Sequence, residues 1–268
     1  MTLLRNLAVA AFAWLALPAF AQDYSDEDKA AAMDFAMHDA VFTLYHEGAH
    51  LLVGELGLPV LGREEDAADA LAVILILQYS EDEDEMYNTL IDSAEGWYME
   101  AEESTGEGIE DLMYYDEHSL DIQRAYAVVC MIVGAEPEMF AEIADAYEME
   151  PERQEDCGPV FGQAEDSWMT LLEPHMTDTP GPEIEVTYDE AGEYQHIADA
   201  LKERRLLEGL AELLRASFAL PGPVSFHARQ CGESNAHYDP ELHEIVYCYE
   251  LGDEKYRTWL ETPEEEAE

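Results

Sequence analysis

The chain has 268 residues, of which 62 are Asp or Glu and only 12 are Lys or Arg, so its formal net charge is −50 at pH 7. Such a polyanion would be repelled by nucleic acids and by anionic membrane surfaces, which excludes the first as partners and disfavours the second. The acidic surplus fits either a solvated surface, the commoner use of charge runs, or the attraction of cationic substrates and partners. Hydrophobic residues make up 48% of the chain, enough for a large core.

The first 21 residues, MTLLRNLAVAAFAWLALPAFA, have the pattern of a secretory signal peptide. One basic residue, Arg5, precedes an apolar stretch that ends in the small-x-small sequence Ala19-Phe20-Ala21. An uncleaved anchor is the alternative. We therefore expect an exported bacterial protein, periplasmic or secreted, that begins near Gln22. We expect no membrane span after cleavage, because the next apolar run, Ala70 to Leu77, is too short to cross a bilayer.

Residues after the signal predict helices first and strands later. Apolar residues at helical spacing predict helices at 26–53, 64–78, 86–102, 119–133, 137–147 and onward to 172, with a loop at 103–110. A Pro- and Gly-containing segment at 174–182 is the candidate boundary. Beyond it we expect strands at 183–188, 224–229 and 243–251 and one long helix at 194–218. The pattern predicts an α+β protein with a mostly helical domain at 22–176, a β-α-β-β module at 183–258 and an acidic tail at 259–268.

The four cysteines predict disulfides. None of them lies in a CxxC pair, so a cysteine metal site is not expected, and an even number in an exported chain favours disulfides over free thiols. Four cysteines allow three pairings. Proximity in the sequence favours Cys130 with Cys157 and Cys231 with Cys248.

The segment His46-Glu47-Gly48-Ala49-His50 has the HExxH pattern of zinc hydrolases. Histidines four apart on a helix project from one face, so His46 and His50 can share one zinc ion. Glu47 is then placed as the catalytic base, which takes a proton from water and returns it to the leaving amine. The alternative is two surface histidines beside a glutamate.

A catalytic zinc site needs a third protein ligand. The metzincin pattern would require Gly at position 53 and His at position 56, and Val53 and Leu56 exclude it. The helix at 64–78 offers Glu65 as the ligand, with Glu64 as its rival. Asp69, four residues beyond Glu65, can accept the free ring N–H of a zinc histidine. Alternatively, these acidic residues only mark a helix start.

Residues 42–69, FTLYHEGAHLLVGELGLPVLGREEDAAD, resemble the signature of a bacterial family of zinc metallopeptidases of unknown biological role, similar to the gluzincins. The resemblance extends to the segment 118–126 and to Cys130, Arg153 and Cys157, covering about 42–172. It implies a zincin-like helical domain with His46, His50 and Glu65 as zinc ligands and Glu47 as the base. Gly48 departs from the family pattern and costs a helix about 1 kcal/mol relative to Ala.

His118 is a candidate second catalytic residue, because these enzymes need a group that stabilises the oxyanion; the alternative is a surface or capping histidine. Arg124 is a weaker candidate for the same role, and its chemistry favours the alternative, an ion pair with a carboxylate. We expect the other histidines, His38, His175 and His196 among them, to be structural.

The C-terminal stretch from Cys231 to Leu251 also resembles this family, and the strand at 243–251 is a candidate edge for binding an extended peptide beside the zinc site. The predicted function is hydrolysis of peptide or protein substrates, cationic ones among them, with one zinc ion. A noncatalytic zinc-binding periplasmic module is the alternative, and a non-peptide amidase would share the same site.

Overall fold

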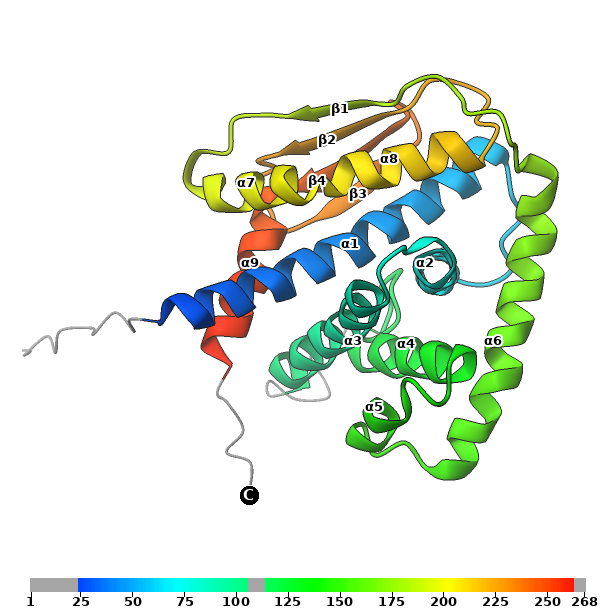
Figure 1. Cartoon of the computed structure of the whole chain (residues 1–268), viewed down its shortest axis with the longest axis vertical. Helices are drawn as coiled ribbons and strands as arrows, with labels where there is room; N and C mark the ends of the chain where they lie inside the picture. Colours follow the sequence, from blue (N-terminus) through cyan, green and yellow to red (C-terminus); the bar gives the residue numbers. More distant parts are fainter. Residues whose placement is uncertain (1–23, 106–113, 263–268) are drawn as a thin grey trace, which may run out of the picture.

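The computed structural model describes residues 24–105 and 114–262 and shows a mostly helical α+β protein with one small sheet (Figure 1). The predicted fold class is confirmed. The predicted signal peptide, most of the loop at 103–110 and residues 263–268 of the predicted acidic tail lie outside the described residues.

Helices make up the first part of the chain, as predicted. They are α1 (Asp26–Leu56), α2 (Glu64–Tyr79), α3 (Glu83–Thr105), α4 (Asp121–Ala135), α5 (Ala141–Ala146) and α6 (Pro151–Leu172). A capping box between Ser25 and Asp28 begins α1, and Gly57 ends it in a left-handed conformation with φ of 64°. The helix expected at 137–147 is shorter than predicted and corresponds to α5.

The rest of the chain forms the sheet and its helices. The elements are η1 (Glu173–His175), β1 (Glu185–Tyr188), η2 (Gly192–Tyr194), α7 (Gln195–Arg204), α8 (Leu206–Ser217), β2 (Ser225–Arg229), β3 (Ala236–Asp239), β4 (Glu244–Cys248) and α9 (Tyr249–Glu261). The division into two domains near 174–182 stays a prediction, since one cluster of buried apolar residues joins the two parts.

Two expectations for this region need correction. The single helix expected over 194–218 is broken at Arg205, which has a positive φ of 55°; no Gly or Pro marks the break. The strand expected over 243–251 ends at Cys248, where α9 begins. Aromatic residues around Tyr249 favour a strand locally, but the amphipathic pattern beyond them is helical and packs on α1. Strand β3 was not predicted.

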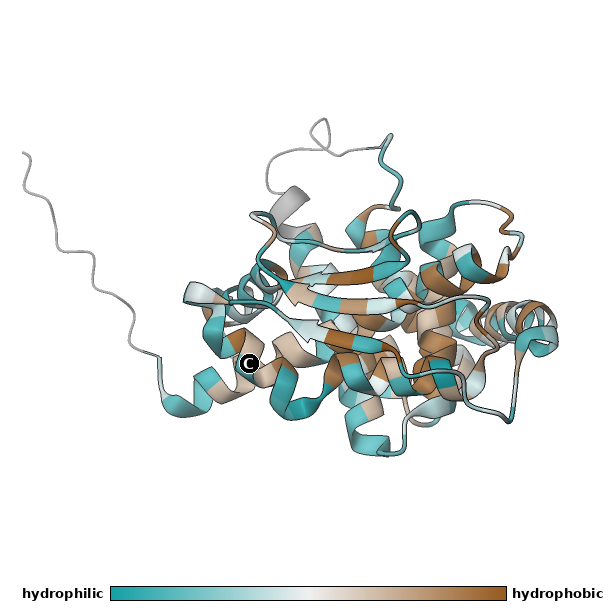
Figure 2. Cartoon of the chain, turned by 90° about the horizontal axis from the view of Figure 1, so that it is seen from above, coloured by the Kyte–Doolittle hydropathy of each residue, from teal (hydrophilic) through white to brown (hydrophobic). Residues whose placement is uncertain are grey.

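The sheet has the strand order β1-β2-β4-β3, in which β1, β2 and β4 are parallel and β3 is antiparallel to β4. Strand β4 is therefore internal and buried along its length, so the expectation that it offers an edge to a peptide is wrong. The edge strand near α1 is β3. Figure 2 looks onto the sheet and shows its strands as a layer in front of the helices, with hydrophobic residues (brown) in the strands and in the helices behind them.

Helix α1 crosses the middle of the molecule and contacts both parts, with α2 and α3 on one side and α8, α9 and β3 on the other (Figure 1). The helix is continuous through Gly48. A Cβ atom at Gly48 would lie 3.3 Å from both Cδ atoms of Leu210. The glycine thus lets α8 approach the helix that carries the HExxH motif.

Both predicted disulfides are present, Cys130–Cys157 and Cys231–Cys248. The first ties α4 to α6, and the second ties the segment after β2 to the end of β4. Disulfides persist in oxidising compartments, so the pair is consistent with an extracellular protein. Within residues 24–105 and 114–262, no helix combines the length and apolar character needed to cross a membrane.

Candidate metal centre

Three side chains converge between α1 and α2. The Nε2 atoms of His46 and His50 lie 3.1 Å apart, and the Oε2 atom of Glu65 lies 3.1 Å from the first and 3.2 Å from the second. The two histidines are one turn apart on α1, which places their rings on one face. Glu65 comes from the first turn of α2, which packs along α1.

This triangle has the dimensions of a tetrahedral zinc site. Ligand atoms 2.0–2.1 Å from a tetrahedral centre lie about 3.3–3.4 Å from one another. The three observed separations fall just below that value, and two imidazole nitrogens with one carboxylate form a common catalytic zinc set. His46, His50 and Glu65 therefore fit a zinc ion without rearrangement of the backbone.

Asp69 contacts the far side of the His46 ring. Its Oδ1 atom lies 2.7 Å from Nδ1 of His46. Arg124 of α4 donates to the same carboxylate twice, from Nε at 2.8 Å and from Nη2 at 2.7 Å. Burial acts to raise the pKa of Asp69, but Arg124 and His46 outweigh it and hold the pKa well below its ordinary value. Asp69 is thus an ionised acceptor that orients the His46 ring.

The protonation of His46 depends on these carboxylates. Burial acts to lower the pKa of His46, but hydrogen bonds to Asp69 and Glu65 raise it to about 9. Two carboxylates thus favour a proton on this ring, and a metal ion at Nε2 would have to displace that proton.

Glu47 is buried, with 6% of its surface exposed, yet it lines a cavity beside His46. Burial raises the pKa of its carboxyl, although His46 and His50 act in the opposite direction. The backbone of Tyr238, in edge strand β3, acts in the same direction as the two histidines. A carboxyl with a raised pKa next to a candidate metal site is suited to carry a proton between reactants.

His118 and Glu64 lie at the edge of the triangle. The Nε2 atom of His118 is 3.1 Å from Oε2 of Glu65, and ligand atoms of His46, Glu65 and His118 all lie within 4.8 Å of one another. Glu64 lies on the other side, with Oε1 2.9 Å from Nδ1 of His50. Glu64 therefore contacts the other ring nitrogen of His50, whereas Glu65 contacts Nε2 of both histidines.

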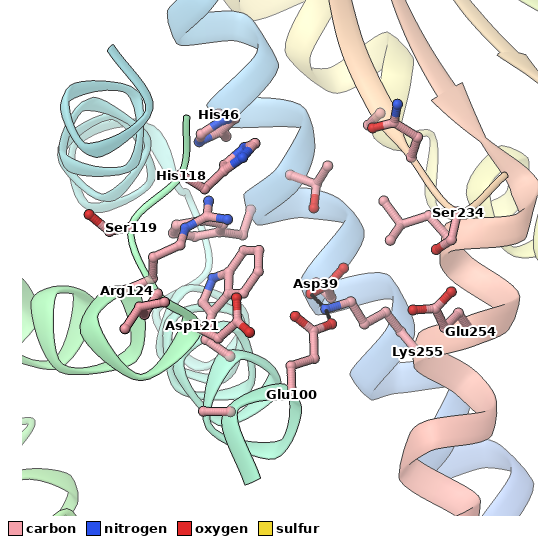
Figure 3. A pocket seen from close by; sticks show the side chains of 18 of the residues that line it. Asp39, His46, Glu100, His118, Ser119, Asp121, Arg124, Ser234, Glu254 and Lys255 are labelled. Carbon is pink, nitrogen blue, oxygen red and sulfur yellow. Dashed lines mark hydrogen bonds and ion pairs between the residues drawn. The ribbon is translucent and has the colours of Figure 1, made fainter. Parts of the chain in front are cut away.

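A cavity of about 500 Å³ extends from this site along the same face of α1 (Figure 3). Its walls come from α1, α3, the segment before α4 and the first turn of α4, the residues leading into β3, and α9. Charged side chains mark its two ends, with His46 and His118 at one and Asp39, Glu100 and Lys255 at the other. The cavity gives a substrate access to Glu47.

The sequence did not identify several of the residues that surround the site. Trp97 lies under the guanidinium of Arg124, whose Cζ atom is 3.6 Å from the ring centroid. Lys255 is buried, and its Nζ lies 3.2 Å from Oδ1 of Asp39 and also contacts Glu100. The sequence contained one hint of Lys255, which is that lysines are scarce in so acidic a chain. That scarcity does not indicate which carboxylates Lys255 contacts.

His38 was expected to be structural. Its Nδ1 atom lies 2.5 Å from Oδ2 of Asp92 on α3.

Comparison with known families agrees with this geometry. The model of a family described as a putative metallopeptidase, DUF4344, matches residues 11–172 and 188–268. The chain belongs to this family. The resemblance to a bacterial metallopeptidase family is thereby confirmed, and the matched segments of this metallopeptidase family member include both α1 and the sheet strands β2, β3 and β4. No curated protein and no solved structure matches the chain.

Proposed function

We propose that this protein is an exported zinc metallopeptidase of the gluzincin type that hydrolyses peptide bonds. The observation that carries the proposal is the triangle of His46, His50 and Glu65, with the buried Glu47 beside it on a cavity wall. The family description supports a metallopeptidase, and the disulfides support export.

When bound, zinc supplies Lewis acidity that polarises the peptide carbonyl and activates water. Glu47 accepts a proton from the attacking water and delivers it to the leaving amine, and its raised pKa suits the second step. Asp69, fixed by Arg124, holds His46 with Nε2 directed at the triangle. His118, which contacts Glu65, donates a hydrogen bond to the carbonyl oxygen as that oxygen becomes negatively charged.

One observation favours a second function. Ligand atoms of His118, Glu65 and His46 lie within 4.8 Å of one another and form a second candidate set of three. If His50 bound the same ion as these three, the site would be closed by four protein ligands, which is typical of structural rather than catalytic zinc. The protein would then be a noncatalytic zinc-binding module for a partner. The side chain of His118 is nearly half exposed, at 46%, and also contacts Asp116 through Nδ1. A histidine this exposed, on a loop, is a weaker candidate for a fourth ligand than the buried residues of α1, which favours the peptidase.

The test compares Glu47→Gln with wild type, using Glu27→Gln as a matched control because Glu27 is an exposed residue of the same helix. Zinc content and hydrolysis of an unfolded protein substrate are measured for all three. We expect equal zinc content, with activity reduced at least about 10²-fold only in Glu47→Gln, since general acid–base catalysis contributes about 10²–10⁴-fold. Zinc binding with no activity in any variant would support the noncatalytic module, and equal activity would contradict the role of Glu47.

A further inference from the structure

The end of the cavity away from the candidate metal centre contains an excess of carboxylates. Asp39, Glu100, Asp121 and Glu254 line it, together with one buried cation, Lys255. Lys255 is already paired with Asp39 and Glu100. The other cation of the cavity wall, Arg124, is held by Asp69. Formal charge in this part of the cavity is therefore negative even after Lys255 is counted.

A buried acceptor in this cluster has no partner among the described residues. Asp39 is only 4% exposed, and while its Oδ1 atom contacts Lys255, its Oδ2 atom makes no hydrogen bond. The indole Nε1 of Trp97, on the same wall, is likewise unpartnered. Buried polar atoms are nearly always satisfied in native proteins. Both atoms are themselves shielded from solvent, so this wall is short of polar partners. The Asp39 oxygen lacks a donor, and a small turn of its carboxylate towards the cavity would bring it to a ligand that donates a hydrogen bond.

The pKa values of the carboxyls support an unmet need for positive charge. Burial raises the pKa of Asp39, with Glu100 acting in the same direction and Lys255 against it. Burial and then Glu100 raise the pKa of Asp121. No Lys or Arg of the described segments forms an ion pair with Asp121 or Glu254 within 4.0 Å. A further cation at this end of the cavity would stabilise the ionised forms of these groups.

The position of the cluster suits a substrate side chain. Asp39 and His46 are seven residues apart on α1, so they share a face at a spacing of about 10 Å along the helix axis. About three residues of extended peptide span that distance. The long aliphatic stem of a Lys or Arg side chain spans part of the same distance, and such stems pack well on apolar walls. Phe42, Trp97 and Leu251 supply that wall.

We propose that this acidic end of the cavity is a specificity subsite for a lysine or arginine side chain of the substrate, read by Asp39, Asp121 and Glu254. The proposal rests on the proposed peptidase function for the position of the scissile bond, and it names the substrate class as basic peptides. Lys255 keeps Asp39 and Glu100 in place, and its presence among the carboxylates disfavours a second metal ion there.

The test measures binding apart from hydrolysis. Zinc-loaded Glu47→Gln protein is titrated calorimetrically with four short peptides that differ at one position, which carries Arg, Lys, norleucine or Glu. The position is moved along the peptide to locate the subsite. We expect the Arg and Lys peptides to bind at least about tenfold more tightly than the norleucine peptide, since one tenfold step corresponds to 1.4 kcal/mol.

The variant is a charge reversal, Asp121→Lys with Glu254→Lys, in the same Glu47→Gln background. Its matched control is Glu165→Lys with Asp166→Lys, two exposed residues of α6 outside the cavity wall. Both pairs change the net charge equally, so any attraction by the whole acidic protein is the same in both. We expect only the cavity pair to abolish the preference for Arg and Lys. The milder Asp121→Asn, which we expect to reduce it several-fold, covers a failure of the double variant to fold.

The possible outcomes distinguish a failure of the subsite proposal from a failure of the proposed peptidase function. Equal loss of preference in the two charge reversals, no preference at all, or tightest binding of the Glu peptide would overturn the subsite. Wild-type hydrolysis of all four peptides at one rate would also overturn it while leaving the peptidase function intact. A basic preference in binding with no hydrolysis would support the subsite and overturn the peptidase function.

Discussion

Helix α1 carries two buried histidines, His38 and His46, whose surroundings are alike on one side of the ring. They are 6% and 5% exposed, and the Nδ1 atom of each lies close to a carboxylate, at 2.5 Å from Asp92 and at 2.7 Å from Asp69. The other nitrogen differs. The Nε2 atom of His46 lies 3.1 Å from Nε2 of His50 and 3.1 Å from Oε2 of Glu65. Among the described residues, the Nε2 atom of His38 has one such neighbour, Oε1 of Glu85 at 3.6 Å.

The comparison teaches that burial and a carboxylate partner do not by themselves make a metal ligand. A histidine with one hydrogen-bonded nitrogen is a common way to join two helices, here α1 and α3 at His38. A ligand also needs its second nitrogen to converge with further donor atoms. Of the two histidines, only His46 meets that condition in the described structure.

The largest expected difference between the two histidines is in metal affinity. His46→Ala removes one corner of the triangle, so we expect zinc affinity to fall by more than the roughly 100-fold typical of residues that only support a ligand. His38→Ala should leave it unchanged. Zinc dissociation constants from competition with a chelator check both. Equal affinity in the two variants would refute the assignment of His46.

The carboxylate partners allow a smaller test. Asp69→Asn should lower zinc affinity about 10–100-fold, because the neutral amide of Asn accepts the ring N–H of His46 more weakly than an ionised carboxylate does. Removing this partner also leaves Arg124 buried without its counter-charge, which costs about 3–5 kcal/mol of stability. Asp92→Asn should change zinc affinity less than twofold. A similar loss of zinc affinity in both variants would show that the supporting role of Asp69 is not specific to the metal centre.

The smallest effect is expected at Glu64. Its side chain is 49% exposed and contacts His50 on the nitrogen that faces away from the triangle. Glu64→Gln should therefore lower zinc affinity only a few-fold, while Glu65→Gln should have an effect as large as that of His46→Ala. Chelator competition on the two single variants is the measurement, and the reverse order would make Glu64 the ligand.

The sequence was sufficient for the parts of the site that lie within one or two neighbouring helices. Residues four apart share a helix face, so spacing alone predicted that His46 and His50 could share a metal ion. For Glu65 and Asp69 the spacing was weak evidence in so acidic a chain, and the family resemblance was needed to prefer Glu65 over Glu64. Those predictions are supported by the triangle and by the Asp69 contact. Helical spacing also predicted most helices, and proximity in the sequence predicted both disulfides.

The rest depended on contacts between distant segments. Lys255 reaches Asp39 from the other end of the chain, and no local pattern relates the two. The break at Arg205 is a left-handed residue without Gly or Asn, the residues that usually mark such a conformation. Strand β3 is four residues long and has no alternation of burial, so periodicity could not reveal it.

The most direct test of the account is a crystal structure of the zinc-loaded protein with anomalous data on both sides of the zinc absorption edge. We expect one anomalous peak, bounded by Nε2 of His46, Nε2 of His50 and a carboxylate oxygen of Glu65, with each ligand about 2.0–2.2 Å away. No peak within that triangle, or a peak ligated by Glu64 instead of Glu65, would contradict it.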